Sequence, residues 1–178
     1  MRDGDALENN PHVSRSALEA IHSQVFGWAL SRCNFDHMAA EDLVQQAYVE
    51  LLSGRARFDN KSSLKTFVFA IVQNLVRSRY RRLASRLRLA ANLAAQPRDI
   101  AVIADEPGPR GEVWKAVYAL PARQRDIIEL VFCRELTIEE ASSVMGVSIG
   151  TGRVHYDRAK KALRTKLADT SVTQNDRN

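Results

Sequence analysis

Apolar residues recur at intervals of three and four positions along most of the chain, which is the pattern of amphipathic α-helices. In the first half, this pattern predicts three helices, at about 16–33, 39–52 and 64–95. The first is expected to begin at Ser16, because Ser16 and Glu19 have the spacing of a capping box. Ser53-Gly54 is expected to end the second helix. No segment alternates apolar and polar residues over a useful length, so no strand is predicted.

A change of composition at residues 96–111 separates the two halves of the chain. Pro107-Gly-Pro109 lies in this segment, and proline disfavours a preceding helix, so we expect a flexible linker. Beyond it, short helices are predicted at 112–120, 122–133, 137–145 and 149–167. The expected fold is all-α, with two small helical domains joined by the linker. The expected domains are 14–95 and 112–169, with disordered tails at 1–13 and 170–178.

The segment from Thr137 to Tyr156 has the spacing of a helix-turn-helix. Thr137 and Glu140 form a predicted capping box, Gly146 closes the first helix, and Ser148 caps the second. The second helix of such a motif enters the major groove of DNA, and hydroxyls and N–H groups at its N-terminus can hold phosphate. The side chains expected to pack the two helices together are those of Ile138, Ala141, Val144 and Val147. A purely structural helix pair with a solvated basic face is the alternative.

Residues 62–82 combine aromatic side chains with the basic run Arg77-Ser-Arg-Tyr-Arg-Arg82. Aromatic rings and arginines are what a protein needs to hold the unstacked bases of a single strand. Taken alone, Phe67 and Phe69 fit a helix core, and the arginines fit a solvated helix end. Asn74 lies within an apolar helix, where it needs a partner if buried and suits a base edge if exposed.

Charge is distributed unevenly along the chain, whose formal net charge is +5. Residues 1–54 carry 3 basic and 8 acidic side chains, residues 55–100 carry 11 and 2, and residues 101–178 carry 12 and 11. A basic block suits a polyanion, and an acidic block suits a basic protein surface. Solvated helix faces would give the same counts, so charge alone does not decide between these interpretations.

The residue types needed for catalysis or metal binding are scattered. Cys33 and Cys133 lie outside any Cys-x-x-Cys or Cys/His cluster, so reduced thiols are expected rather than a disulfide or a zinc site. The four histidines are dispersed, and His12 falls in the predicted tail. No signal peptide is recognisable and no stretch of about 20 apolar residues occurs, which predicts a cytoplasmic protein without membrane insertion. We therefore expect no enzyme, no cofactor and no bound metal.

Two segments, in this order, resemble the sigma-70 family of bacterial RNA polymerase sigma factors, in particular its extracytoplasmic-function (ECF) type. Ala40–Leu52, with Phe58 and Ser63–Arg82, is similar to the second sigma domain, and Leu120–Leu163 is similar to the fourth. The resemblance covers about residues 14–168. It implies an alternative sigma factor that directs core polymerase to promoters, melts the −10 element and recognises the −35 element. The implied partners are core polymerase (through its clamp helices and flap), promoter DNA and an anti-sigma factor, and the free protein is expected to be monomeric.

The resemblance also implies roles for individual positions. Those matching the surface that docks on the clamp helices of core polymerase are Asp42, Gln45, Gln46 and Val49. Those matching contacts to the single-stranded −10 element are Gly54, Arg55, Phe58, Lys65, Asn74, Arg77, Arg79, Arg81 and Arg82. Those matching contacts to the duplex −35 element are Ser148, Thr151, Arg153, Val154, His155, Asp157 and Arg158. A neutral exposed histidine is an equally good account of His155.

Three features of the sequence are unusual for this family. Gln46 stands where an acid is usual. Gly152 replaces a β-branched residue of the recognition helix and should cost about 1 kcal/mol relative to alanine. We expect Tyr156 to fill the space that Gly152 leaves. Val154 and Asp157 predict an unusual −35 preference, because valine contacts a thymine methyl and aspartate accepts from cytosine N4.

Two other functions fit parts of the sequence. A sigma-mimicking protein would sequester an anti-sigma factor without binding DNA, which Gln46 and Gly152 favour and the intact basic run at 77–82 disfavours. A simple helix-turn-helix transcriptional regulator would leave the first domain unexplained and would be expected to dimerise on two half-sites. Promoter-dependent transcription separates a sigma factor from the first alternative, and the molecular mass in solution separates it from the second.

Overall fold

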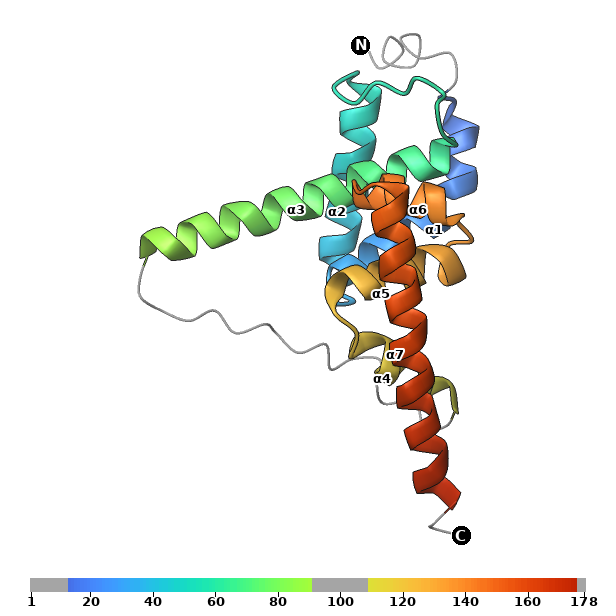
Figure 1. Cartoon of the computed structure of the whole chain (residues 1–178). Helices are drawn as coiled ribbons and strands as arrows, with labels where there is room; N and C mark the ends of the chain where they lie inside the picture. The colour runs from blue at the N-terminus through green and yellow to red at the C-terminus, as the bar shows by residue number, and fades with distance from the viewer. Residues whose placement is uncertain (1–12, 91–108, 176–178) are drawn as a thin grey trace. The chain divides into compact units, whose positions relative to one another are not determined.

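The computed structural model describes residues 13–90 and 109–175, and every regular element in these residues is helical (Figure 1). The chain divides into two compact units, Met1–Arg98 and Asp99–Asn178, called unit 1 and unit 2 here. The all-α fold in two helical units is therefore confirmed. The predicted tail up to His12, residues 96–108 of the predicted linker and residues 176–178 lie outside the described residues. Within the described residues, no helix is long and apolar enough to cross a bilayer.

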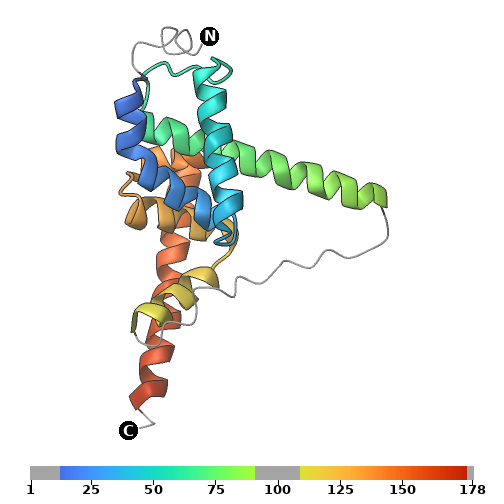
Figure 2. The same ribbon diagram turned by 180° about the vertical axis from the view of Figure 1, so that it is seen from behind.

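Unit 1 contains three helices that each pack against the other two: α1 (Arg15–Arg32), α2 (His37–Leu52) and α3 (Leu64–Ala90). Their shared core includes the fully buried side chains of Trp28, Leu43 and Phe69, and the rings of Trp28 and Phe69 are 6.1 Å apart. The Arg32 guanidinium lies 4.2 Å from the centre of the Trp28 ring, a cation–π contact at the end of α1. Figures 1 and 2 show the second half of α3 extending beyond α1 and α2, and residues 79–85 are exposed.

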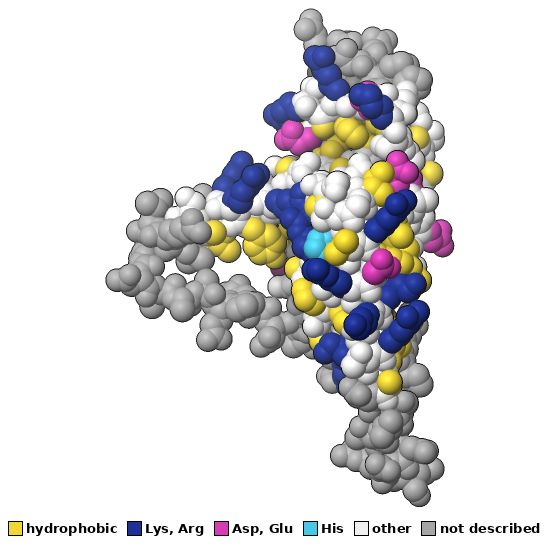
Figure 3. All heavy atoms as spheres, viewed as in Figure 1, with side chains coloured by type: hydrophobic (Ala, Val, Ile, Leu, Met, Phe, Trp, Pro, Cys, Tyr) yellow, Lys and Arg dark blue, Asp and Glu magenta, His cyan; other side chains and the backbone are white. Residues whose placement is uncertain are grey.

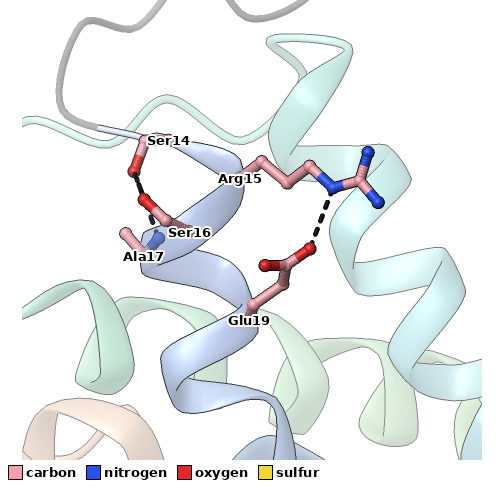
Figure 4. A network of polar contacts seen from close by, with 5 residues as sticks. All are labelled: Ser14, Arg15, Ser16, Ala17 and Glu19. Atoms are coloured by element: carbon pink, nitrogen blue, oxygen red, sulfur yellow. Dashed lines mark hydrogen bonds and ion pairs between the residues drawn. The ribbon is translucent and has the colours of Figure 1, made fainter.

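The N-cap of α1 is Ser14 rather than the predicted Ser16 (Figure 4). The Ser14 hydroxyl accepts a hydrogen bond from a backbone N–H of the first turn at 3.1 Å. Glu19, the expected partner in a capping box with Ser16, instead pairs with Arg15 at 2.9 Å. Val13, which directly precedes the cap, is buried, and an apolar residue at this position fixes the entry of the chain into a helix. The choice between the two serines therefore depends on packing that local spacing does not reveal.

The ends of α2 depend on residues in left-handed conformations. Asn34 and Phe35 precede the helix with φ of 52° and 62°, and Asp36 then caps its N-terminus. At the other end the predicted stop is confirmed, because α2 ends at Leu52 and Gly54 has a φ of 72°. Glycine adopts this conformation without the steric cost that a Cβ atom imposes. After this turn, the chain continues into the polar segment that leads to α3.

Unit 2 is built around its last helix. The helices α4 (Pro109–Tyr118), α5 (Ala122–Ile128) and α6 (Ile138–Met145) all pack against α7 (Ile149–Asn175). The buried core includes Ile127, Leu130, Met145 and Ala159. The helix predicted at 122–133 is confirmed in its bounds, but its last turn is π-helical: α5 continues directly into η1 (Glu129–Cys133). A π turn bonds residues five apart, so a periodicity of 3.6 does not predict it.

The helix-turn-helix predicted in unit 2 is confirmed in its local details. Both arms of the capping box between Thr137 and Glu140 are present at the start of α6. Gly146 follows α6 with a φ of 61°, and the Ser148 hydroxyl accepts from the Thr151 N–H at 3.2 Å at the start of α7. Helix α7 continues to Asn175, eight residues beyond its predicted end, because no glycine or proline interrupts residues 168–175.

Candidate nucleic-acid interface

The four residues expected to dock on core polymerase lie together on the exposed side of α2. Its buried residues, Ala40, Leu43, Val44, Ala47 and Leu51, occupy the opposite side. Asp42, Gln45 and Val49 form one stripe along the helix, and Val49 is 51% exposed. The stripe continues to Met38, one turn before Asp42, whose side chain is 79% exposed. Sequence reasoning missed Met38, although its position four residues before Asp42 was a usable signal.

Gln46 lies at the edge of this stripe and contacts α3. The Arg79 Nη2 atom donates a hydrogen bond to the Gln46 Oε1 atom at 3.2 Å. Arg79 is exposed, and the expectation that it contacts DNA phosphates stays a prediction. Because Gln46 is neutral, the contact leaves the positive charge of Arg79 uncompensated. The pair joins the expected polymerase surface to the expected DNA surface.

An apolar cavity lies beside this pair, between the end of α1, α2 and α3. It is lined by Arg32, Cys33, Leu43, Val76, Arg79, Tyr80 and Leu83. Tyr80 and Leu83 are exposed, so part of the apolar wall is open to solvent. Burial raises the pKa of the Cys33 thiol, which keeps it protonated near neutral pH. The cavity suits an apolar side chain with acidic neighbours, since both of its charged lining residues are arginines.

The loop before α3 places Phe58 against a helix face. Its ring lies 5.2 Å from that of Phe67, at an interplanar angle of 47°. Phe67 is half-buried, whereas Phe69 is fully buried and belongs to the core. The Arg55 guanidinium pairs with the Glu50 carboxylate at 3.2 Å. Of the three residues of this loop expected to contact DNA, Phe58 is held by packing, Arg55 is held by an ion pair, and Gly54 forms the turn after α2.

Asn74 is exposed, and the basic residues expected beside it follow on the same helix. Residues three and seven positions apart share a helix face, so Asn74, Arg77 and Arg81 form one row along α3. Arg81 and Arg82 are exposed, while Lys65 and Arg77 are half-buried. The exposure of Asn74 removes the need for a buried partner and leaves its amide accessible to a base edge.

The residues expected to read duplex DNA occupy the exposed side of α7. Arg153, Val154, Asp157 and Arg158 are all exposed, and Val154 is 46% exposed. The opposite side carries the buried Gly152 and Ala159. His155 is half-buried at the edge of this face. Ser148 and Thr151 are exposed at the N-terminus of α7, with their hydroxyl oxygens 2.9 Å apart. Figure 3 shows Lys and Arg side chains distributed along α7.

The expectation about Gly152 is wrong in two respects. A Cβ atom at this position would lie 1.9 Å from the Ser142 Oγ atom, so alanine would displace the Ser142 hydroxyl from its place next to α7. The side chains nearest to Gly152 are those of Ser142 and Ile138, and Tyr156 does not fill this space. The Tyr156 ring instead stacks on Phe132 at 6.1 Å. The predicted cost of Gly152 was based on helix propensity, which depends on α7 alone and does not include the close approach of α6.

Phe132 is an exposed aromatic residue that sequence reasoning did not single out. It lies in the π-helical turn η1, its side chain is 61% exposed, and its ring is nearly parallel to that of Tyr156. The Lys160 ammonium lies 5.1 Å from the centre of the Tyr156 ring. Burial raises the pKa of the neighbouring Cys133 thiol. The side chains of Phe132, Tyr156 and Lys160 therefore lie at one edge of the exposed face of α7.

Two family models match the chain. Sigma-70 region 2 matches residues 17–86, and Sigma-70, region 4 matches residues 110–163. The first model therefore falls within unit 1, and the second falls within unit 2.

Curated proteins with similar sequences are named as ECF RNA polymerase sigma factors. The chain is 30% identical over 133 residues to the ECF RNA polymerase sigma factor EcfG of Rhodopseudomonas palustris, a match that covers 72% of this chain and 71% of the relative. It is 29% identical over 161 residues to the ECF RNA polymerase sigma factor SigF of Caulobacter vibrioides, covering 90% of this chain and 89% of the relative.

One similar solved structure is that of the sigma factor RpoE in complex with the anti-sigma factor NepR from Bartonella quintana. The TM-score is 0.68 at 25% sequence identity, and the match covers 86% of this chain and 96% of that one.

Proposed function

The chain belongs to the ECF family of RNA polymerase sigma factors, and we propose that its two units divide promoter recognition between them. As a sigma factor, it directs RNA polymerase to promoters. In the proposal, unit 1 binds core polymerase and holds the melted −10 element, and unit 2 reads the −35 element in duplex DNA. The observation that carries the proposal is the exposed face of α7, which presents Arg153, Val154, Asp157 and Arg158 from a capped helix-turn-helix.

Unit 2 reads base edges through side chains of different chemistry. Arg153 and Arg158 can donate to guanine or to phosphate, whereas Asp157 accepts only from a donor such as cytosine N4. Val154 can contact a thymine methyl. Ser148 and Thr151, at the N-terminus of α7, supply hydroxyls and backbone N–H groups for a phosphate. The two hydroxyls already contact each other, so a phosphate would bind to a preformed cap.

Unit 1 holds single-stranded DNA along α3. Asn74 offers an amide to the Watson–Crick edge of an unstacked base, and Arg77 and Arg81 follow it in the same row toward the backbone phosphates. Phe58, packed on Phe67, supplies an aromatic surface nearby. Gly54, Arg55, Lys65, Arg79 and Arg82 complete the set by resemblance to the family.

Core polymerase docks on α2 in this proposal. The stripe of Met38, Asp42, Gln45 and Val49 has apolar ends and a polar middle, which suits a helical partner such as the clamp helices. The neutral Gln46 lowers the negative charge of this stripe, and Arg79 adds a positive charge at its edge. Docking of this stripe on a basic surface should therefore depend less on salt concentration than docking of an all-acidic stripe would.

An anti-sigma factor is the proposed regulator. The sigma factor RpoE in the similar solved structure is bound to the anti-sigma factor NepR. In this chain, the cavity between Leu43, Tyr80 and Leu83 lies next to the polymerase stripe and would admit an apolar side chain of such a partner. No catalytic step is part of the proposal, and a sigma factor acts with the polymerase in the cytoplasm.

Transcription from a pool of promoters tests the proposed function. The full chain is mixed with bacterial core polymerase and a library in which the region upstream of the start site is randomised. The expected result is a shared two-part motif at a fixed distance from the start sites. A folded chain that binds core polymerase and yields no promoter-dependent transcript would contradict the proposal and favour a protein that sequesters an anti-sigma factor.

A further inference from the structure

We propose that Ser142 and Gly152 are a matched pair of positioning residues that set the pose of the recognition helix α7, and with it the −35 sequence that this chain prefers. The inference rests on the proposed function of unit 2. Neither residue lies on the exposed face of α7, so neither is expected to contact DNA.

The contact between α6 and α7 is too close for a side chain at position 152 unless Ser142 moves. A Cβ atom there would lie 1.9 Å from the Ser142 Oγ atom and 3.1 Å from the Ser142 Cβ atom. Rotating the hydroxyl away would relieve only the first of these contacts. Moreover, the Ser142 hydroxyl donates to the Ile138 carbonyl at 2.6 Å, and this hydrogen bond would be lost. A methyl group at position 152 therefore displaces the Ser142 hydroxyl and pushes Ser142 away by a few tenths of an ångström, which widens the gap between the two helices.

Ser142 also holds the turn that leads into α7. Its backbone carbonyl accepts from the Val147 N–H at 3.0 Å, and the Ser143 carbonyl accepts from the Gly146 N–H at 2.9 Å. This pair of bonds is a Schellman motif, which fixes how the chain leaves α6. One residue thus holds the turn through its backbone, and its side chain lies against Gly152 in the first part of α7. The angle and the distance between the two helices depend on both contacts.

The direction of the contact links it to base recognition. Gly152 faces α6, whereas Val154 and Asp157 are on the exposed side of α7. A wider gap between the helices would move these side chains outward relative to the rest of unit 2. Arg158 is six residues from Gly152, about 9 Å along the helix, so the whole reading face lies close to the contact. Hydrogen bonds to base edges tolerate shifts of only a few tenths of an ångström.

The test measures base preference in the −35 element, using the full chain with core polymerase and a promoter library randomised at that element. The variants are Gly152→Ala and the double variant Ser142→Gly with Gly152→Ala, which removes the side chain that the new methyl would meet. Thermal unfolding of each full-length variant is measured in parallel. Gly150→Ala is the stability control, because a Cβ atom there would lie 3.9 Å from the nearest atom, the Ser148 Oγ.

We expect Gly152→Ala to change the preference at one or more −35 positions by about fivefold or more, the scale of one base contact. Its melting temperature should fall, while that of Gly150→Ala should not. The double variant should return the preference toward that of the original chain. If Gly152→Ala weakens transcription from all −35 sequences equally and leaves their ranking unchanged, the pair is merely structural and the proposal is wrong.

A further variant covers the case in which Gly152→Ala does not fold. Ser142→Ala keeps the Cβ atom and removes only the hydroxyl from the contact, so α7 can approach α6 more closely. An altered −35 preference in Ser142→Ala supports the proposal, and an unchanged preference in a folded Ser142→Ala overturns it. If the original chain selects no −35 motif at all, it is the proposed function of unit 2 that fails.

Discussion

In unit 1, Asn74, Arg81 and Arg82 stand on the exposed side of α3, and the opposite side of that helix carries large core residues such as Phe69 and Val72. In unit 2, the helix α7 has a glycine facing α6, and a methyl group there would meet the Ser142 hydroxyl. Recognition in unit 1 should therefore depend on which side chains are present. Recognition in unit 2 should depend in addition on how closely two helices approach.

The loops of both units hold residues other than glycine at a positive φ. In unit 1 these are Asn34, Phe35 and Asn60, at 52°, 62° and 58°, and in unit 2 it is Glu135, at 57°. Asparagine tolerates the left-handed region, because its short polar side chain can hydrogen-bond to the nearby backbone. Glutamate lacks this hydrogen bond, so the contact between its Cβ atom and the backbone costs free energy. Glu135 lies two residues after the end of the π-helical turn at Cys133, so the strained residue is in the loop that follows this turn.

The largest expected effect is the loss of the aromatic core of unit 1. Trp28→Ala should lower the free energy of unfolding by about 3–5 kcal/mol, because Trp28 is fully buried against Phe69. Hydrogen exchange should show lost protection in α1, α2 and α3. An equal loss in α5, α6 and α7 would contradict separate cores for the two units.

Trp28→Phe is the matched control for this substitution. The Trp28 Nε1 atom is buried and finds no hydrogen-bond acceptor among the described residues. Phenylalanine keeps a ring against Phe69 and removes this buried donor, so its cost should be well below that of alanine.

A smaller effect, of opposite sign, is expected at the strained loop of unit 2. Glu135→Gly should raise the free energy of unfolding by about 1 kcal/mol, since glycine adopts a positive φ without a steric cost. Urea denaturation measures the change. Asn60→Gly is the counterpart in unit 1 and should gain less. Equal gains at both positions would show that the residue type does not matter at these turns.

The smallest effect concerns the contact that joins the two expected surfaces of unit 1. A double-mutant cycle of Gln46→Ala and Arg79→Ala, measured by urea denaturation, should give a coupling of about 0.5 kcal/mol, because both side chains are exposed. In binding to core polymerase, Arg79→Ala should have a larger effect than Arg82→Ala, which lies beyond the α2 contact. The reverse order would show that the contact with Gln46 does not make Arg79 part of the polymerase-binding surface.

Sequence reasoning was most accurate where a structure depends on neighbouring residues. Thr137, Glu140, Gly146 and Ser148 specify caps and turns within a few positions of themselves, and all four were predicted in their structural roles. The exposure of Asn74 was left open, because either environment was consistent with its neighbours in the sequence.

Predictions failed where a contact between distant segments decided the outcome. Ser16 has a good local partner in Glu19, but packing of Val13 moves the cap to Ser14. The cost assigned to Gly152 considered one helix, whereas a methyl group there would meet Ser142 on the neighbouring helix. The π-helical turn at Glu129–Cys133 interrupts a regular pattern, so Phe132 was not recognised as exposed.

The division of labour between the units is tested most directly by promoter selection with one substitution in each. Asn74→Ala and Arg158→Ala both replace exposed side chains, so each should change the free energy of unfolding by less than about 0.5 kcal/mol. In transcription from randomised promoters, Asn74→Ala should lose base preference in the −10 part only, and Arg158→Ala in the −35 part only. If each variant loses both parts equally, or if both variants keep the original motif, the two units do not divide promoter recognition as proposed.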